Sequence, residues 1–198
     1  MAEPASWLRT VEPDDADAAT RSALDAARGP RGQLDNLYRP FAWRGHMLGP
    51  ADGLYRAIWH DARTTLPARV LELIAAQVAA LTGCDYGLAH HGANFLALSA
   101  DRDRAVRILA DLPAAGCDDE IAPVLAYVEK LTLSPAAMVA ADLDRLRDHG
   151  LDDGQIFEIN QAAAAMAYWA RVATGLGIRL GDEAIGFYDA DQTIGNRG

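Results

Sequence analysis

The sequence contains only two cysteines, Cys84 and Cys117, which are too few for the disulfide framework of a small secreted domain. It also lacks a long hydrophobic run. The most apolar stretches, Leu71–Leu81 and Ala162–Ala173, are short and include charged or polar side chains, so neither is expected to span a bilayer. The first ten residues show no basic region followed by an apolar stretch, and no signal peptide is therefore expected. These absences predict a cytoplasmic protein.

Positive charge is scarce as well. The 198-residue chain carries 18 Lys and Arg against 28 Asp and Glu, for a net charge of −10. Nucleic acids and anionic membranes both require a basic face, so neither is an expected partner. Because half of the residues are apolar and under a quarter are charged, the chain is expected to fold into a globular core. We expect its partner to be a small-molecule substrate.

Several motifs with known chemistry are missing. We find no Walker loop, no dinucleotide-binding glycine pattern and no serine-nucleophile elbow. His46, His60, His90 and His91 together with Glu72 are candidate metal ligands, since imidazole and carboxylate suit several divalent ions. However, His46 and His60 show no tight ligand spacing, and the adjacent His90 and His91 are expected on different helix faces. The sequence therefore predicts no metal and no cofactor.

Helical patterns recur along the chain, and no stretch alternates with the period of a β-strand. Glycine, proline and cap residues divide the chain into predicted helices at 15–28, 34–48, 51–63, 67–82, 84–98, 101–112, 118–133, 135–149 and 152–176. The fold class is therefore all-α, with one domain over residues 1–198. Residues 1–33 form an N-terminal extension, and the tail 181–198 is expected to pack on a partner subunit or to fray.

Cap residues mark where several of these helices should begin. Thr65, Ser99 and Ser134 are placed as caps of the helices that follow them. Asp152 and Gln155 have the spacing of a capping box at the start of the last long helix. That helix is rich in alanine, which allows neighbouring helices to approach closely.

Chemistry is most plausible in the segment from Leu66 to Phe95. Cys84 follows the helix-stopping Gly83 and opens a helix, where unpaired N–H groups and the helix dipole favour a thiolate, although Asp85 opposes this. His91 lies two turns further along the same face. Glu72 shares that side only if helices 67–82 and 84–98 pack antiparallel.

A carboxylate, a histidine and a thiol arranged in this way can move protons, with His91 as the relay and Glu72 as its support. The alternative is structural. A single cysteine at a helix start is often a small buried hydrophobe, and a histidine on a helix face is often structural or solvated. The residues alone leave both interpretations open.

The spacing Glu72, eleven residues, Cys84, two residues, Gly87, three residues, His91 resembles the active-site motif of the alkylhydroperoxidase D and carboxymuconolactone decarboxylase superfamily. The resemblance extends over about residues 36–178. It implies an alkylhydroperoxidase D-like helical bundle and assembly as a homotrimer or homohexamer. It also implies that Glu72, Cys84 and His91 are the catalytic residues.

One position departs from this pattern. The peroxidase branch has a second cysteine where this chain has Gly87, so no local CxxC disulfide can form. Cys117 could resolve an oxidised Cys84 only if the fold brought the two together. Gly87 also removes bulk between Cys84 and His91, and this is expected to leave room for a small ligand.

Four residues are predicted to contact the substrate: Tyr86, Gly87 and Trp169 as pocket wall, and Arg171 as a possible partner of a substrate carboxylate. We predict a cofactor-independent enzyme that performs decarboxylation, isomerisation or cyclisation on a small carbonyl or carboxylate compound. A thiol-dependent peroxidase that uses Cys84 is the first alternative. A catalytically silent helical binding protein is the second.

Overall fold

A computed structural model describes residues 4–11, 15–112 and 121–188 of the chain. Within these ranges the regular secondary structure is entirely helical, which confirms the predicted fold class. The α-helices are α1 (Ala18–Ala26), α2 (Leu48–Trp59), α3 (Ala68–Leu81), α4 (Asp85–Ala97), α5 (Arg102–Ala110), α6 (Ala122–Leu133), α7 (Ala140–Asp148) and α8 (Asp153–Leu176). Short 3₁₀ helices cover Arg39–Trp43, Gly45–Met47 and Pro135–Ala137.

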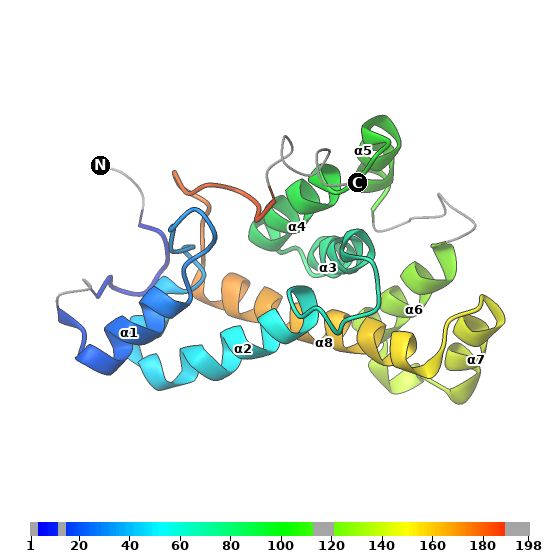
Figure 1. Ribbon diagram of the computed structural model, residues 1–198, viewed down its shortest axis with the longest axis horizontal. Coiled ribbons are helices and arrows are strands. Elements are labelled where there is room, and N and C mark those ends of the chain that lie inside the picture. The colour runs from blue at the N-terminus through cyan, green and yellow to red at the C-terminus, as the bar shows by residue number, and fades with distance from the viewer. Residues whose placement is uncertain (1–3, 12–14, 113–120, 189–198) are drawn as a thin grey trace.

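Helix α3 is the centre of the fold. It packs against α4, α6 and α8, and Figure 1 shows it lying between α4 and the long helix α8. Every residue from 71 to 79 is buried, as expected for a helix that is apolar on all sides. The two polar residues in this stretch, Glu72 and Gln77, are also buried and hydrogen bonded. Gln77 donates to the Leu125 carbonyl of α6, whereas Glu72 faces α4.

Helices α3 and α4 form an antiparallel hairpin. Gly83 adopts a left-handed conformation with φ of +66°, which allows the chain to reverse within the short turn between the helices. Cys84 is the N-cap residue of α4. Glu72 can face His91 only if these two helices are antiparallel, and the hairpin confirms that arrangement.

The predicted helix 34–48 is wrong. This segment forms turns and two 3₁₀ helices, and α2 begins at Leu48, so Gly49 and Pro50 lie in the first turn of α2 instead of separating two helices. Pro40 lies in the first turn of the first 3₁₀ helix, where proline is tolerated because the N–H that it lacks has no partner at a helix start. Gly45 is buried directly against Thr20 of α1, where a larger side chain would collide.

The predicted helix 135–149 is interrupted. A 3₁₀ turn at Pro135–Ala137 is followed by Met138 in an extended conformation, and α7 then begins at Ala140. The Asp142 side chain accepts a hydrogen bond of 2.9 Å from the Val139 N–H, which fixes this later start. The first residues of predicted helix 118–133 lie outside the described residues, and α6 is described from Ala122.

Two of the predicted caps act elsewhere. Thr65 bonds to Glu158 of α8, and the cap position of α3 is occupied by Pro67. Ser99 donates back to the Phe95 carbonyl, and Asp101 caps α5 in its place. Ser134 makes no side-chain cap either. The capping box at the start of α8 is confirmed, with hydrogen bonds of 2.8 and 3.1 Å between Asp152 and Gln155.

The C-terminal segment 181–188 packs on α4 of the same chain. The N–H of Gly186 bonds to Nδ1 of His90 at 3.3 Å, and the N–H of Phe187 bonds to Oδ1 of Asn94 at 2.5 Å. These residues therefore pack on their own chain, and packing of the tail on a partner subunit stays a prediction. Residues 189–198 lie outside the described part of the chain. Among the helices described, none is long and apolar enough to cross a membrane.

Candidate functional site

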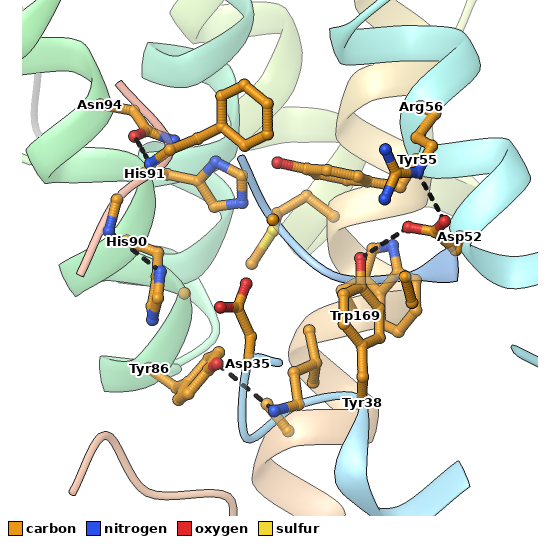
Figure 2. A pocket seen from close by; sticks show the side chains of 18 of the residues that line it. Asp35, Tyr38, Asp52, Tyr55, Arg56, Tyr86, His90, His91, Asn94 and Trp169 are labelled. Atoms are coloured by element: carbon orange, nitrogen blue, oxygen red, sulfur yellow. Dashed lines mark hydrogen bonds and ion pairs between the residues drawn. The ribbon is translucent and has the colours of Figure 1, made fainter. Parts of the chain in front are cut away.

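A cavity of about 80 Å³ opens between α2, α4 and α8. The segment 29–38 and the C-terminal residues Gly186 and Phe187 complete its wall (Figure 2). This volume is several times what a single water molecule needs, so the cavity can hold a small molecule. Both chain ends that the sequence analysis set apart, the N-terminal extension and the tail, contribute to it.

Glu72 and His91 form a buried pair behind the cavity wall. His91 Nδ1 lies 2.7 Å from Glu72 Oε2, and the Glu72 side chain is completely buried. A carboxylate oxygen only accepts, so Nδ1 carries the shared proton and, in the neutral ring, Nε2 carries the lone pair. His91 lines the cavity, and Glu72 lies directly behind it. Glu72 therefore supports the cavity wall without forming part of it.

Cys84 is at the start of α4 and lines the same cavity. Its Sγ accepts a hydrogen bond of 3.4 Å from the Gly87 N–H, and the residue is 3% exposed. The structure therefore brings Cys84 and His91 to one wall, as their seven-residue separation predicted. Cys117 lies outside the described residues.

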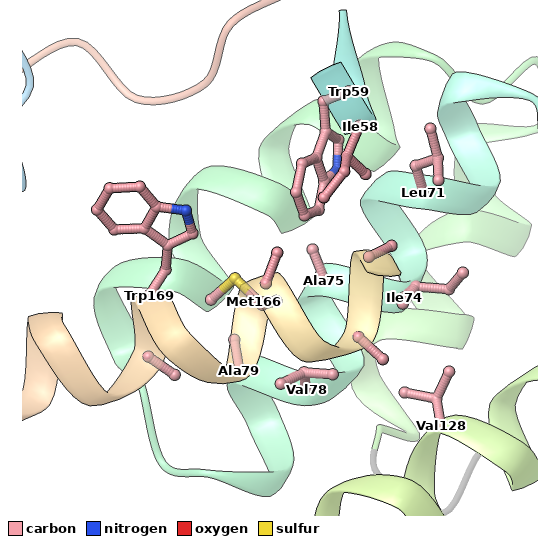
Figure 3. Packing of buried hydrophobic residues seen from close by; sticks show 14 of the residues in the cluster. Ile58, Trp59, Leu71, Ile74, Ala75, Val78, Ala79, Val128, Met166 and Trp169 are labelled. Carbon is pink, nitrogen blue, oxygen red and sulfur yellow. The ribbon is translucent and has the colours of Figure 1, made fainter. Parts of the chain in front are cut away.

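Gly87 lines the cavity, as predicted, but it does not leave the expected gap. A Cβ atom at this position would collide with the Met166 methyl group and would lie 3.3 Å from both Ala79 Cβ and Cys84 Sγ. Figure 3 shows Met166 between Trp169 and Ala79, and the Met166 methyl group is the atom that a Cβ at position 87 would meet. The room created by the missing side chain is filled by the protein itself, because cores close over small voids.

The other predicted substrate contacts divide into two groups. Tyr86 and Trp169 line the cavity, as predicted. Arg171 does not: it is exposed on α8 and its guanidinium bonds to the Ala167 carbonyl of the same helix at 2.8 Å. Trp169, Ala170 and Ala173 form the buried face of α8, and position 171 falls outside that face.

An aromatic wall from α2 completes the surroundings of His91. The rings of Tyr55 and Trp59 are stacked at 5.0 Å, and both lie near the imidazole. Figure 2 shows the Tyr55 hydroxyl pointing towards the His91 ring. Burial, and then the charge of Glu72, raise the pKa of Tyr55 well above its ordinary value. The hydroxyl therefore remains protonated and is available as a hydrogen-bond donor.

Two further carboxylates reach the cavity. Asp52 accepts hydrogen bonds from Arg56 at 2.6 Å and from the Tyr38 hydroxyl at 3.0 Å, so its charge is balanced. The Asp35 carboxylate points into the middle of the cavity (Figure 2), and its Oδ1 has no hydrogen-bond partner. Burial raises the pKa of Asp35, while the nearby positive potential of His90 opposes this.

Besides His91, two other candidate metal ligands, His60 and His90, line the cavity. His60 stacks against Phe187 at 4.1 Å, and burial lowers its pKa, so it stays neutral. His90 uses both ring nitrogens, with Gly186 N–H at 3.3 Å and Glu183 Oε1 at 3.4 Å. His90 and His91 thus bond to different parts of the fold, but both line the same cavity. The described residues contain no group of three His, Cys, Asp or Glu side chains arranged to hold a metal ion.

Comparison with known proteins identifies the family of the central segment. Residues 51–130 match the carboxymuconolactone decarboxylase family. This match covers fewer than half of the residues of the chain. No curated protein shows significant sequence similarity to it.

Solved structures share the whole fold. An uncharacterized peroxidase-related protein from Silicibacter sp. TM1040 has a TM-score of 0.78 at 22% identity, covering 91% of this chain and 94% of that one. A peroxidase-related protein with an alkylhydroperoxidase AhpD core from Ralstonia eutropha JMP134 has a TM-score of 0.80 at 20% identity, covering 91% and 95%. A cysteine-to-alanine variant of the debrominase Bmp8, in complex with 2,3,4-tribromopyrrole, has a TM-score of 0.68 at 16% identity, covering 92% and 94%. At these identities the likeness establishes the fold, and the predicted alkylhydroperoxidase D-like bundle is confirmed.

The carboxymuconolactone decarboxylase region contains Glu72, Cys84 and His91, whereas Asp35 and Trp169 lie outside it. The cavity is therefore built partly from the family region and partly from its flanks.

Several residues that line or support the cavity were not predicted from the sequence, and only some of them have a recognisable spacing in it. Asn94 follows His91 by three positions and so shares its helix face, where it donates to Glu72 Oε2 at 3.1 Å. Asp52 and Arg56 have the spacing of a helical ion pair. Asp35 and Phe187 come from irregular segments without periodicity, and no local pattern marks them.

Proposed function

We propose that this protein is a cofactor-independent enzyme that moves a proton on a small carbonyl or carboxylate compound, with decarboxylation, isomerisation and cyclisation as the reactions within its reach. The observation that carries the proposal is the buried Glu72–His91 pair at 2.7 Å, with His91 on the wall of a small cavity. A neutral imidazole held by a carboxylate at Nδ1 presents Nε2 as a general base, and its conjugate acid can return the proton.

Each nearby group has a role in such a step. His91 Nε2 takes the proton from the carbon next to a carbonyl, the electron pair of that C–H bond forms a C=C bond, and the π pair of the C=O bond moves to the oxygen, which gains negative charge. Tyr55, which stays protonated and points towards His91, donates a hydrogen bond to that developing negative charge. Glu72 is a positioning residue, because it touches His91 and not the cavity.

Proton transfer can be measured before the natural substrate is known. A panel of small ketones, enols and keto acids is incubated with the protein in D₂O, and loss of the C–H signal next to the carbonyl is followed by ¹H NMR. We expect at least one compound to exchange faster with the wild type and not with His91→Gln. If no compound exchanges faster with the wild type than with the variant, the proposal is wrong.

A second candidate is thiol chemistry at Cys84. Its support is the position of Sγ on the cavity wall, together with the structural likeness to peroxidase-related proteins and to the debrominase whose cysteine variant was solved with a halogenated pyrrole. In the peroxidase form, the thiolate attacks a peroxide oxygen, the O–O bond breaks, and Cys84 sulfenic acid and an alcohol result. An external thiol must then reduce the sulfur, because Gly87 cannot serve as a resolving residue.

Hydroperoxide consumption with an added thiol tests this second candidate. Fast consumption that is lost in Cys84→Ser, while the proton exchange above is absent, would favour thiol chemistry over the acid–base function. Consumption equal in the wild type and in Cys84→Ser would dismiss it.

A further inference from the structure

Three described residues that line the cavity have a buried polar atom without a hydrogen-bond partner: Trp169 Nε1, Asp35 Oδ1 and His60 Nε2. Trp169 is 4% exposed, and its Nε1–H has no hydrogen-bond partner. Asp35 Oδ1 is likewise without a partner, and its carboxylate points into the cavity (Figure 2). Buried polar groups in folded proteins are nearly always paired, so an unpaired donor and an unpaired acceptor in one cavity point to a ligand that pairs with both.

Arg56 is the one Lys or Arg side chain among the described residues that line the cavity. Arg56 is bound to Asp52 at 2.6 Å. His60 stays neutral because burial lowers its pKa, and both ring nitrogens of His90 are already hydrogen bonded. The carboxyl groups of Asp35, in the cavity wall, and of Glu72, behind His91, add further acidic groups near the cavity. An anionic ligand would lose its hydration here without gaining a counter-charge.

Aromatic rings form much of the cavity wall. Tyr55, Tyr86, Trp169 and Phe187 all contribute to or border it, and His60 is stacked flat against Phe187. Such rings favour planar molecules, which they contact by stacking or by their edges.

From these three features we infer that the cavity binds an uncharged, planar small molecule that donates an O–H or N–H to Asp35 and accepts a hydrogen bond from Trp169. This rests on the proposed function and sharpens it. Carbonyl and enol compounds fit, whereas carboxylate anions are excluded, so isomerisation or cyclisation is the reaction class and decarboxylation of an anion is not.

Two pairs of similar compounds test the effect of ligand charge and of an O–H donor separately. Benzamide and benzoate are nearly isosteric and differ in charge, whereas phenol and anisole differ in the O–H donor. Binding of each to the full-length wild-type protein is measured by isothermal titration calorimetry. We expect benzamide to bind at least about tenfold more tightly than benzoate, and phenol at least about tenfold more tightly than anisole, the usual scale for leaving a buried polar group unpaired. Benzoate binding as tightly as benzamide would overturn the inference.

Asp35→Asn tests whether Asp35 causes the preference for benzamide over benzoate. The variant keeps the side-chain shape and removes the negative charge, so the preference for benzamide over benzoate is expected to shrink about tenfold or more. Asp111→Asn, at an exposed aspartate far from the cavity, is the matched control and should retain the wild-type preference. An unchanged preference in Asp35→Asn contradicts the inference, and if that variant does not fold, the wild-type comparison decides alone.

These binding measurements are independent of turnover. If benzoate binds best while His91-dependent proton exchange persists, the substrate class is wrong and the proposed function stands. If the uncharged probes bind as expected but no compound exchanges protons, the proposed function fails while the binding preference stands.

Discussion

The Nδ1 atom of His91 lies 2.7 Å from Oε2 of Glu72, and the Glu72 side chain has no exposed surface. Asn94 donates to the same oxygen at 3.1 Å, so two side chains from one face of α4 hold a carboxylate of α3. A buried carboxylate needs such partners, because leaving it unpaired is costly. The pairing therefore fixes the orientation of the imidazole that faces the cavity.

Removal of His91 is the first test of its role. We expect His91→Gln to lower the rate of proton exchange by roughly 10²–10⁴-fold, the scale of general acid–base catalysis. Glu72→Gln should cost less, on the order of tenfold or more, because it disturbs the orientation of the ring but leaves the ring in place. His149→Gln and Glu129→Gln change exposed residues of the same types and should leave the rate unchanged. Equal rates in His91→Gln and His149→Gln would contradict the assignment.

Asn94 is expected to couple the site to the C-terminal segment. Its Oδ1 accepts the Phe187 N–H at 2.5 Å, while its Nδ2 donates to Glu72. Asn94→Ala removes both bonds, so the amide of Phe187 should exchange hydrogen faster, as read by hydrogen–deuterium exchange of the C-terminal peptide. The exchange of peptides from α6, far from this contact, serves as the internal control. Unchanged exchange at Phe187 would show that Asn94 does not hold the segment.

The sequence was sufficient to predict most of the fold and the centre of the site, for identifiable reasons. Helices α3 and α8 have strong helical patterns, and the spacing of Glu72, Cys84 and His91 depends only on helix geometry and one antiparallel turn. The segment 34–48 was predicted wrongly because its conformation depends on tertiary packing, such as the close contact of Gly45 with Thr20, which no local pattern shows. Asp35 and Phe187 reach the cavity through irregular chain, which has no period to detect.

The room for a ligand that was expected beside Gly87 is absent for a different reason. A missing side chain can be replaced by another residue, and Met166 fills the space from α8. No pattern near position 87 in the sequence indicates which distant side chain will do so. Arg171 was misplaced because its apolar neighbours in α8 suggested burial, whereas its own position falls on the exposed face.

Restoring a second cysteine should add peroxidase turnover. A Cβ at position 87 would lie 3.3 Å from Cys84 Sγ, a separation that suits a disulfide once Met166 moves aside. We therefore expect Gly87→Cys combined with Met166→Ala to form a vicinal disulfide with hydroperoxide and to gain dithiol-dependent turnover at least about tenfold over the weak wild-type rate. Met166→Ala alone is the control and should not gain it. Strong dithiol-dependent turnover by the wild type, lost in Cys84→Ser, would promote the thiol function.

Acid stability should depend on Asp142. Lys130 holds this buried carboxylate at 2.6 Å, and that hydrogen bond, with the Val139 N–H, lowers its pKa below the ordinary value of 3.8. A lowered pKa means that the charged form stabilises the fold, so the contribution is full above about pH 4 and is lost as pH falls further towards the folded-state value. The difference in Tm between wild type and Asp142→Asn should be constant near neutral pH and shrink below pH 4.

Asp148→Asn, at an exposed aspartate of the same helix, controls for the loss of one negative charge. If it lowers Tm as much as Asp142→Asn does, the ion pair with Lys130 has no special role in stability.

We also expect a homo-oligomer, a trimer or a hexamer. Beyond the family resemblance, α8 exposes Phe157 at 63% and Tyr168 at 42%, and large apolar side chains at the surface of a helix favour contact with another subunit. Light scattering at micromolar concentration should give a mass three or six times 21.2 kDa. A monomer under these conditions would contradict the prediction.

The tautomer of His91 tests the account most directly, because the base proposed here is a neutral ring with its proton on Nδ1 and its lone pair on Nε2. Long-range ¹H–¹⁵N NMR spectra of the ¹⁵N-labelled protein at pH 8, assigned by comparison with His91→Gln, distinguish the two neutral tautomers. We predict a protonated Nδ1 and an unprotonated Nε2 in the wild type, with this preference weakened in Glu72→Gln. A proton on Nε2 of the wild-type ring would contradict the account, since His91 would then have no lone pair to offer the cavity.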